Sequence, residues 1–363
     1  MKKLLFIAPS PLYLEKGSSL RMFAILKILS RYYKIDLVTY STGKEFTLDN
    51  VVIYRTSRFF KPNLAVGIPS ISKLVLDFLM YLKIIRLSLF NHYNVVHCED
   101  FEGIALGYFS GWFNKKSVYV YDLHNRILDN LHLKTKAKSG RDNFLLFLEN
   151  LFVKKTDKII LNWGKYLYDK VLSQKPCFLY YDPIDTNSAT IKNSQDEYLI
   201  YTGNFEEYQG LGDFIPVFAK SNVSYKLYLV GMPTEKIINL IKKYNCTGRI
   251  EVLGRRTVQE TNALIKNSIC GILPRRSGSC MKAIHYILWN KPVIAKDTDS
   301  NREMVTDEYN GYLYSNNEKL LSILEAVQND KKALESLQSG IEKTKKRIFD
   351  IWAEDRFIKE YEK

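Results

Sequence analysis

Short apolar runs alternate with longer stretches of helical periodicity along the whole chain. In the first half the runs are KLLFIAP, KIDLVTY, NVVIYR, NVVHCED, SVYVYDLH and DKIILNW, and in the second half EYLIYTGN, YKLYLVG, RIEVLG, ICGILP and KPVIAKD. Helical patterns such as SLRMFAILKILSRYY and TEKIINLIKKYN stand between most of them. Continuously apolar strands separated by helices predict parallel sheets that are covered on both faces. We therefore expect an α/β protein.

The alternation breaks near residues 175–187, KPCFLYYDPIDTN, where two prolines end the helical period. A chain of 363 residues is also long for a single hydrophobic core. The sequence therefore predicts two Rossmann-like domains joined in this segment. Ligands of such sheets bind outside the carboxyl ends of the strands, and in two domains those ends can face each other across a cleft. Neither G-x-G-x-x-G after the first strand nor G-x-x-x-x-G-K-[ST] occurs, so a dinucleotide or P-loop site has little support.

The composition gives information on the redox compartment and on the charge of possible partners. The five cysteines form no C-x-x-C pair, which argues against a disulfide framework or a zinc site and suits a reducing cytosol. The opening MKKLLFIAPSPLY is too short an apolar run for a signal peptide and is interpreted as a first strand. The net charge of +14 is compatible with nucleic acid, an anionic membrane surface or anionic substrates. No nucleic-acid recognition motif accompanies it, so we expect no nucleic-acid partner.

Residues 72–93, SKLVLDFLMYLKIIRLSLFNHY, are apolar and basic at once. A spanning helix needs about 20 apolar residues with few charges, and four charged side chains interrupt this run, so we do not expect it to cross a membrane. Two interpretations remain. The segment is an interfacial helix on an anionic membrane surface, or it is an ordinary core helix with cations at its edge.

Four loops that follow predicted strands carry small, polar or cationic residues. In EKGSSLRM, Gly17 allows a close backbone approach and Ser18 can cap the next helix. In YTGNFEEYQG, Gly203 ends a strand, and Asn204 and Gln209 are polar groups on the loop. A plain helix cap and an ordinary turn explain these two loops equally well when each is taken alone.

The other two loops are richer in cations. In LGRRTVQE, Arg255 and a second arginine directly follow a strand. They either bind a phosphate or form a solvated pair of surface charges. In LPRRSGSCMKAIHYILWNKPVI, the residues Ser277, Gly278 and Ser279 lead into a helix beginning near residue 280. Backbone N–H groups and the helix dipole attract anions at such an end, so we expect a diphosphate there. Lys282 in the first turn opposes the dipole, which a bound anion would explain.

Taken in order, these loops resemble the large bacterial group-1 glycosyltransferases, glycosyltransferase family 4. The match is strongest from about residue 198 to 315, through TGNFEEYQG, EVLG, KAIHYILWNKPVIA and SNREMVTDEYNGYLY, the last with Glu303 and Asn310. GSSLR resembles the N-terminal glycine loop, VYDLHN the segment with an acceptor-side histidine, here His124, and RIFDIWAEDRFIKEY the final Trp-containing helix. The resemblance covers essentially the whole chain.

The resemblance implies the GT-B fold, an α/β architecture of two facing Rossmann-like domains with an interdomain cleft. Residues 1–182, completed by a C-terminal helix at 345–363, would form the acceptor-side domain. Residues 183–344 would bind the nucleotide sugar. The family implies transfer of a sugar with retention, without a metal or other cofactor, from a donor such as a UDP- or GDP-sugar. The acceptor would be a glycan or lipid-linked glycan in surface-polysaccharide or glycolipid synthesis. The net charge and residues 72–93 favour a peripheral position at the inner face of the cell membrane.

The chain departs from the family pattern at the donor. Where the family's glycine loop carries an Arg and a Lys, this sequence has Asn204 and Gln209. The family also has a Glu-x7-Glu pattern whose second Glu lies seven residues before the Pro of the Pro-Val-Ile turn. Counting back from Pro292 gives His285, and eight further gives Ser277, so both carboxylates are absent. A histidine can make one hydrogen bond with a ribose hydroxyl, or it is a packing residue without a ligand.

The resemblance assigns roles to the remaining residues. Gly278, Ser279 and Lys282 would hold the diphosphate, with His285 and Glu303 near the donor sugar and ribose. His124, with Asp122, would lie at the acceptor side and take part in catalysis.

Two other functions stay open. The loss of the Glu-x7-Glu carboxylates is compatible with an inactive nucleotide-sugar-binding or scaffold protein of the same fold. A nucleotide-sugar epimerase is the third interpretation, although no pair of acid/base carboxylates stands out in the sequence.

Overall fold

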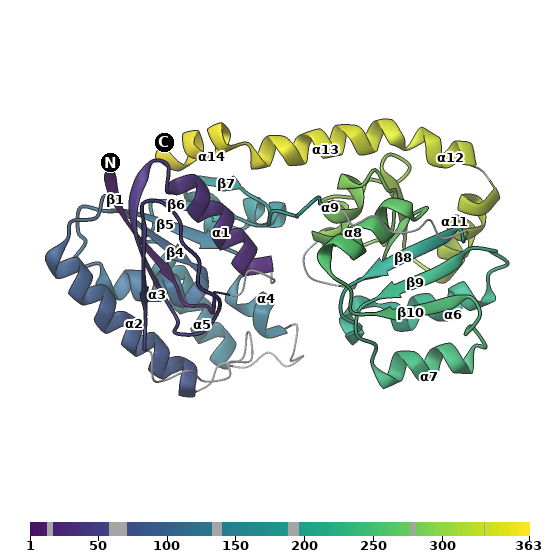
Figure 1. Ribbon diagram of the computed structural model, residues 1–363, viewed down its shortest axis with the longest axis horizontal. Coiled ribbons are helices and arrows are strands. Elements are labelled where there is room, and N and C mark those ends of the chain that lie inside the picture. Colours follow the sequence, from purple (N-terminus) through teal and green to yellow (C-terminus); the bar gives the residue numbers. More distant parts are fainter. Residues whose placement is uncertain (13–16, 58–70, 133–139, 188–195, 277–280, 330) are drawn as a thin grey trace. The chain divides into compact units, whose positions relative to one another are not determined.

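The computed structural model of the protein describes residues 1–12, 17–57, 71–132, 140–187, 196–276, 281–329 and 331–363 (Figure 1). It divides into two compact units, each described by itself below. Unit 1 comprises Met1–Pro183 and Ile351–Lys363, and unit 2 comprises Ile184–Asp350. The first division lies inside the expected linker. The second lies within the helix α13 (Gln338–Trp352) rather than at 344/345, and no break in the sequence pattern marks it because the helix is continuous there.

Unit 1 contains a parallel sheet of seven strands in the order β3-β2-β1-β4-β5-β6-β7. The strands are β1 (Lys2–Ala8), β2 (Tyr33–Thr39), β3 (Val51–Arg55), β4 (Val95–Glu99), β5 (Val118–Leu123), β6 (Lys158–Leu161) and β7 (Cys177–Leu179). The interpretation of 175–187 as linker alone was wrong for its first part, because β7 pairs in parallel with β6. Three residues are too short a run to show as a strand in the sequence.

Helices cover both faces of this sheet. Alternate residues of β1 separate the two cores: Leu4 and Phe6 pack with α1 (Gly17–Leu29) and α14 (Glu354–Glu362), and Leu5 and Ile7 pack with the opposite layer. That opposite layer consists of α2 (Ile71–Phe90), α3 (Asp100–Ser110) and α5 (Gly140–Val153), with α3 in contact with both neighbours. Figure 1 shows these three helices on one side of the sheet. The short elements α4 (Ile127–His132), η1 (Gly164–Tyr168) and η2 (Leu172–Gln174) complete the unit.

Unit 2 contains a parallel sheet of six strands in the order β10-β9-β8-β11-β12-β13. The strands are β8 (Tyr198–Thr202), β9 (Lys226–Val230), β10 (Ile250–Gly254), β11 (Gly271–Leu273), β12 (Val293–Lys296) and β13 (Gly311–Tyr314). The last of these was missing from the predicted strands. The helical elements are η3 (Glu207–Gln209), α6 (Leu211–Lys220), α7 (Glu235–Lys243), α8 (Val258–Asn267), α9 (Met281–Leu288), α10 (Asp299–Arg302), α11 (Asn317–Asn329), α12 (Lys331–Ser336) and α13.

Each sheet has one point where the strand order reverses. It lies between β1 and β4 in unit 1 and between β8 and β11 in unit 2. The loops leaving such neighbouring strands diverge to opposite faces, and the crevice at their carboxyl ends is the usual ligand site of open α/β sheets. The predicted two parallel-sheet α/β domains are therefore confirmed. None of the helices formed by the described residues has the length and apolar character needed to span a bilayer.

Candidate active site

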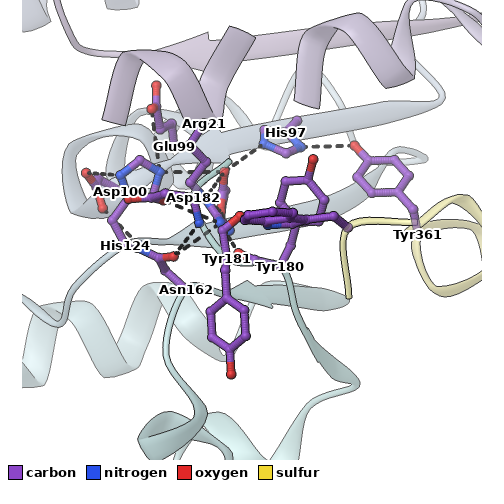
Figure 2. Close-up of polar contacts among 12 residues, drawn as sticks. Arg21, His97, Glu99, Asp100, His124, Asn162, Tyr180, Tyr181, Asp182 and Tyr361 are labelled. Carbon is purple, nitrogen blue, oxygen red and sulfur yellow. Dashed lines mark hydrogen bonds and ion pairs between the residues drawn. The ribbon is translucent and has the colours of Figure 1, made fainter. Parts of the chain in front are cut away.

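In unit 1, ionisable side chains gather at the carboxyl ends of the strands, as Figure 2 shows. The first turns of α1 contribute Arg21, β4 ends in Glu99, and α3 begins with Asp100. The next strand, β5, supplies Asp122, and His124 follows directly after it. These residues are far apart in the sequence and meet because β1, β4 and β5 are neighbours in the sheet.

The centre of this cluster is a fully buried ion pair between Arg21 and Asp122. The Arg21 Nη2 donates to Asp122 Oδ1 at 2.6 Å and its Nε donates to the same oxygen at 3.0 Å. A further Nη1–H donates to the carbonyl oxygen of Tyr180. Burial opposes ionisation of the carboxyl, but the Arg21 charge and contacts from two histidines outweigh it and hold the pKa of Asp122 well below its usual range. The pair is therefore charged at neutral pH.

His124 lies among three carboxylates. Its Nδ1 is 3.5 Å from Asp100 Oδ2, and its Nε2 is 3.6 Å from Glu99 Oε1 and 3.7 Å from Asp122 Oδ2. Burial alone would lower the pKa of this imidazole, but the three carboxylates raise it to about 10. Burial raises the pKa of Glu99 to about 8, so this carboxyl group is mostly protonated at neutral pH. His124 is accordingly a cation held by ion-pair contacts, and its buried Nε2 has no hydrogen-bond partner among the described residues.

The structure brings the predicted residues His124 and Asp122 together, with 3.7 Å between Nε2 and Oδ2, but their main partners differ. Asp122 is fully buried and holds Arg21, which makes it a positioning residue. No role was predicted for Arg21, Glu99 or Asp100. Their signals were a single arginine within the apolar SLRMFAIL helix and two consecutive carboxylates at the end of a buried strand.

In unit 2, Lys282 reaches from α9 into the loop after β8. Its Nζ donates to Gln209 Oε1 at 2.8 Å and to the Tyr201 hydroxyl at 2.8 Å, and it lies 4.2 Å from the centre of the Tyr201 ring. Gly203 makes room for it, because a Cβ at that position would lie 2.5 Å from Nζ. Gly203 also has a φ of +130°, which a residue with a side chain rarely adopts. The ammonium therefore occupies the switch point between β8 and β11.

The surroundings of Lys282 suit an anion. Burial, with a contribution from Arg275, lowers the pKa of its amine well below the usual value. Within the described part of the chain its hydrogen-bond partners are a phenol and an amide rather than a carboxylate. Burial opposes the charge on this half-buried amine, and a bound diphosphate would stabilise its charged form.

Gln209 stands where the family's glycine loop carries a lysine. The amine of Lys282 lies against that side chain, although the two residues are 73 positions apart. The amine beside Gln209 therefore comes from a different element, the helix α9.

A neighbouring pocket of about 300 Å³ opens at the same edge of the sheet. Gly203, Asn204 and Arg255 line it, together with Gly231 and Thr261. Three predicted residues from two separate loops therefore share one pocket. A phosphate or a polar ring would find both an arginine and a glycine-lined wall there.

His285 forms part of a buried hydrogen-bond chain. The Asn262 amide nitrogen donates to the carbonyl oxygens of Asp185 at 2.7 Å and Asn187 at 2.5 Å. Its amide oxygen must then accept, and it lies 2.5 Å from His285 Nε2. Burial lowers the pKa of His285 to about 4, so the ring is neutral at pH 7 with its proton on Nε2. Its Nδ1 is left as a neutral acceptor in place of the family's carboxylate.

The other predicted residues have mixed outcomes. Gly17 and Ser18 open α1. Ser277, Gly278 and Ser279 lie outside the described residues. Glu303 follows α10, and its carbonyl oxygen accepts a hydrogen bond of 3.2 Å from Arg347. Among the described residues no group of three or more His, Cys, Asp or Glu side chains could hold a metal ion.

Comparison with known proteins identifies a family that part of the chain matches. Residues 185–347 match the family described as glycosyl transferases group 1. This stretch lies inside unit 2 and contains Lys282, His285 and the pocket. No curated protein matches the sequence.

Solved glycosyltransferase structures share the fold over nearly the whole chain. HepE of Anabaena in complex with UDP is 14% identical with a TM-score of 0.74, and the match covers 99% of each chain. Sucrose-phosphate synthase from Thermosynechococcus elongatus is 15% identical with a TM-score of 0.72, covering 97% of this chain and 96% of that one. WaaG, a glycosyltransferase involved in lipopolysaccharide biosynthesis, is 12% identical with a TM-score of 0.65, covering 95% of each. The predicted GT-B fold is confirmed.

Proposed function

We propose that the protein transfers a sugar from a nucleotide-sugar donor to a glycan or lipid-linked acceptor. The observation that carries the proposal is the half-buried Lys282 amine against Gln209, at the switch point of a unit that matches group 1 glycosyl transferases. A cation at the carboxyl edge, beside a glycine with positive φ, provides the charge and the space that a diphosphate needs. The neighbour HepE was solved with UDP, which supports a UDP-sugar as donor.

The chemistry follows from where charge develops. In the proposed same-face displacement, the acceptor oxygen bonds to the anomeric carbon while the bond from that carbon to the diphosphate breaks. The electron pair goes to the leaving diphosphate, which also takes the acceptor proton. Lys282 stabilises the charge that forms on the diphosphate, and it needs no metal for this. His285 Nδ1 accepts a hydrogen bond from a donor hydroxyl, and the cationic His124 belongs to the acceptor side.

Thermal unfolding with UDP-, GDP-, ADP- and CMP-sugars tests donor binding. A ligand that binds only the folded state stabilises it by about 2.7 kcal/mol at 100 times its Kd. We expect one class of nucleotide sugar to raise the midpoint in a saturable manner, and the Lys282→Met variant to lose the rise. If no nucleotide sugar changes the midpoint, the proposed function is wrong.

The neutral His285 favours a second candidate, a nucleotide-sugar-binding protein without turnover. It replaces a carboxylate by a single uncharged acceptor. This second function would be supported if the protein bound a donor saturably but released no nucleoside diphosphate in the presence of candidate acceptors.

A further inference from the structure

The helix α2 is apolar on two opposite sides. Its buried stripe, which faces the sheet, is Leu76, Met80, Ile84 and Ser88, spaced four residues apart. The opposite side is apolar too, although it faces solvent. Its exposed large side chains are Ile71, Leu74, Val75, Phe78, Leu82, Leu89 and Phe90, and Ile71 and Phe90 are more than 80% exposed. A helix that only covers a core has a polar outer side.

The two neighbouring helices extend this apolar surface. Phe109 and Trp112, at the end of α3, are exposed by 57% and 75%, and Phe144 and Phe147 of α5 are exposed by 59% and 60%. Since α3 packs between α2 and α5 in one layer, these side chains share the layer's solvent side. We call the exposed apolar side chains of α2, the end of α3 and α5 the outer face.

Hydrogen bonds join α2 to the end of α3, the two elements that carry much of the outer face. The Tyr81 hydroxyl of α2 donates to the carbonyl oxygen of Phe109 at 3.4 Å. Asn114, just past Trp112, donates to the Ser88 hydroxyl at 2.8 Å. Exposed apolar patches of this kind, rimmed by polar residues, mark contacts with membranes or proteins.

The charges around the outer face are mostly positive. Arg86 lies beside the apolar side chains of α2, and the residues 108–116 contain two lysines and no acid. Lys115 Nζ lies 4.2 Å from the ring of Trp112. Lys154 and Lys155 are exposed just after α5. Two acids are nearby: Glu102 of α3 pairs with Lys73 of α2, and the Asp157 carboxylate accepts the backbone N–H of Tyr119 at 2.7 Å.

A pocket of about 600 Å³ lies among these cations. Phe109 and Trp112 line it together with Lys115, Ser117 and Lys155. Asp157 also lines it, but the two lysines outnumber this carboxylate, so the pocket joins the outer face to a net positive site that fits an anionic headgroup beside apolar chains.

We propose that the outer face binds the surface of an anionic lipid bilayer. Its apolar side chains enter the acyl boundary, and the cations around them contact the headgroups. An acidic protein or a second copy of this chain is the competing occupant. A second copy would bring the same cations against one another, which the positive rim disfavours.

Sedimentation of the full chain with vesicles tests this proposal. The vesicles contain either phosphatidylcholine alone or phosphatidylcholine with about one third phosphatidylglycerol, whose anionic headgroups attract basic segments. We expect binding to the anionic vesicles at least tenfold tighter than to the neutral ones, and weaker binding at high salt. The double variant Phe78→Ser with Leu82→Ser should weaken binding at least tenfold, since it removes two apolar side chains from the centre of α2.

The control removes two exposed side chains of unit 2, as Val258→Ser with Tyr309→Ser. It should bind vesicles as the parent chain does. All four positions are solvent-exposed, so circular dichroism should show unchanged folding. The proposal is overturned if the chain does not sediment with anionic vesicles or if both double variants bind equally. It is also overturned if the Phe78/Leu82 variant instead converts a dimer to a monomer in light scattering.

Discussion

Replacing Lys282 with methionine should lower kcat for glycosyl transfer by about 10²–10³-fold, the usual cost of removing one donor to developing charge. The variant keeps the side chain's length but removes the ammonium that contacts Gln209 and the Tyr201 hydroxyl. Stability should fall little or rise, because burial already opposes the charge on this half-buried amine, and its hydrogen-bond partners among the described residues are a phenol and an amide. Steady-state rates of nucleoside diphosphate release measure the effect on kcat, and thermal unfolding measures the effect on stability.

Matched variants control this expectation. Lys242→Met removes an exposed lysine of α7 and should leave kcat unchanged. Gly203→Ala should reproduce the loss in part, since its Cβ would displace the Lys282 amine. Gly212→Ala, with no atom near the added Cβ, should not. If Lys282→Met kept full activity, the proposed diphosphate site would be wrong.

Replacing Arg21 with methionine should lower the free energy of unfolding by about 3–5 kcal/mol, because it leaves the buried Asp122 carboxylate without its partner. Both side chains of this pair are fully buried. Arg31→Met is the matched control, since Arg31 is 55% exposed and pairs with Glu354. Its loss should cost less than about 1 kcal/mol. Denaturant titration of both variants measures the difference, and equal effects would show that the buried pair is not important for stability.

The pH dependence of stability gives a second readout of this network. The pKa of His124 is raised from 6.5 to about 10, so its charged form stabilises the folded state fully below pH 6.5. That contribution declines above pH 6.5 and is lost as the pH rises through about 10. Glu99 acts in the same direction, since its pKa of about 8 makes its ionisation costly in the folded state. Stability should fall on the alkaline side, and His124→Gln should make the fall smaller.

The sequence could predict the sheets because most strands are continuous apolar runs of four to seven residues between helical patterns. It missed β7 and β13 for different reasons. CFL is only three residues long and sits between prolines, and GYLY follows a loop without a preceding apolar run. Local patterns are weak at this length, and pairing with a neighbouring strand decides the conformation.

The sites could be predicted only in part. Gly203, Asn204 and Arg255 each follow a strand, and parallel strands bring such positions to one edge. The contact of Lys282 with Gln209 depends instead on where α9 packs, which residue spacing does not reveal. The same is true of Arg21, which meets Asp122 across 101 residues. A sequence motif does not identify a charged side chain that reaches a site from a different element, whereas the folded structure does.

Hydrogen–deuterium exchange of the full chain with UDP-glucose, and with GDP-mannose as the second donor, tests most directly whether unit 2 holds the nucleotide sugar. One saturating donor should slow amide exchange in residues 202–210 and 281–288, which surround the Lys282 amine. Protection confined to unit 1, or no protection with either donor, would contradict the proposed donor site.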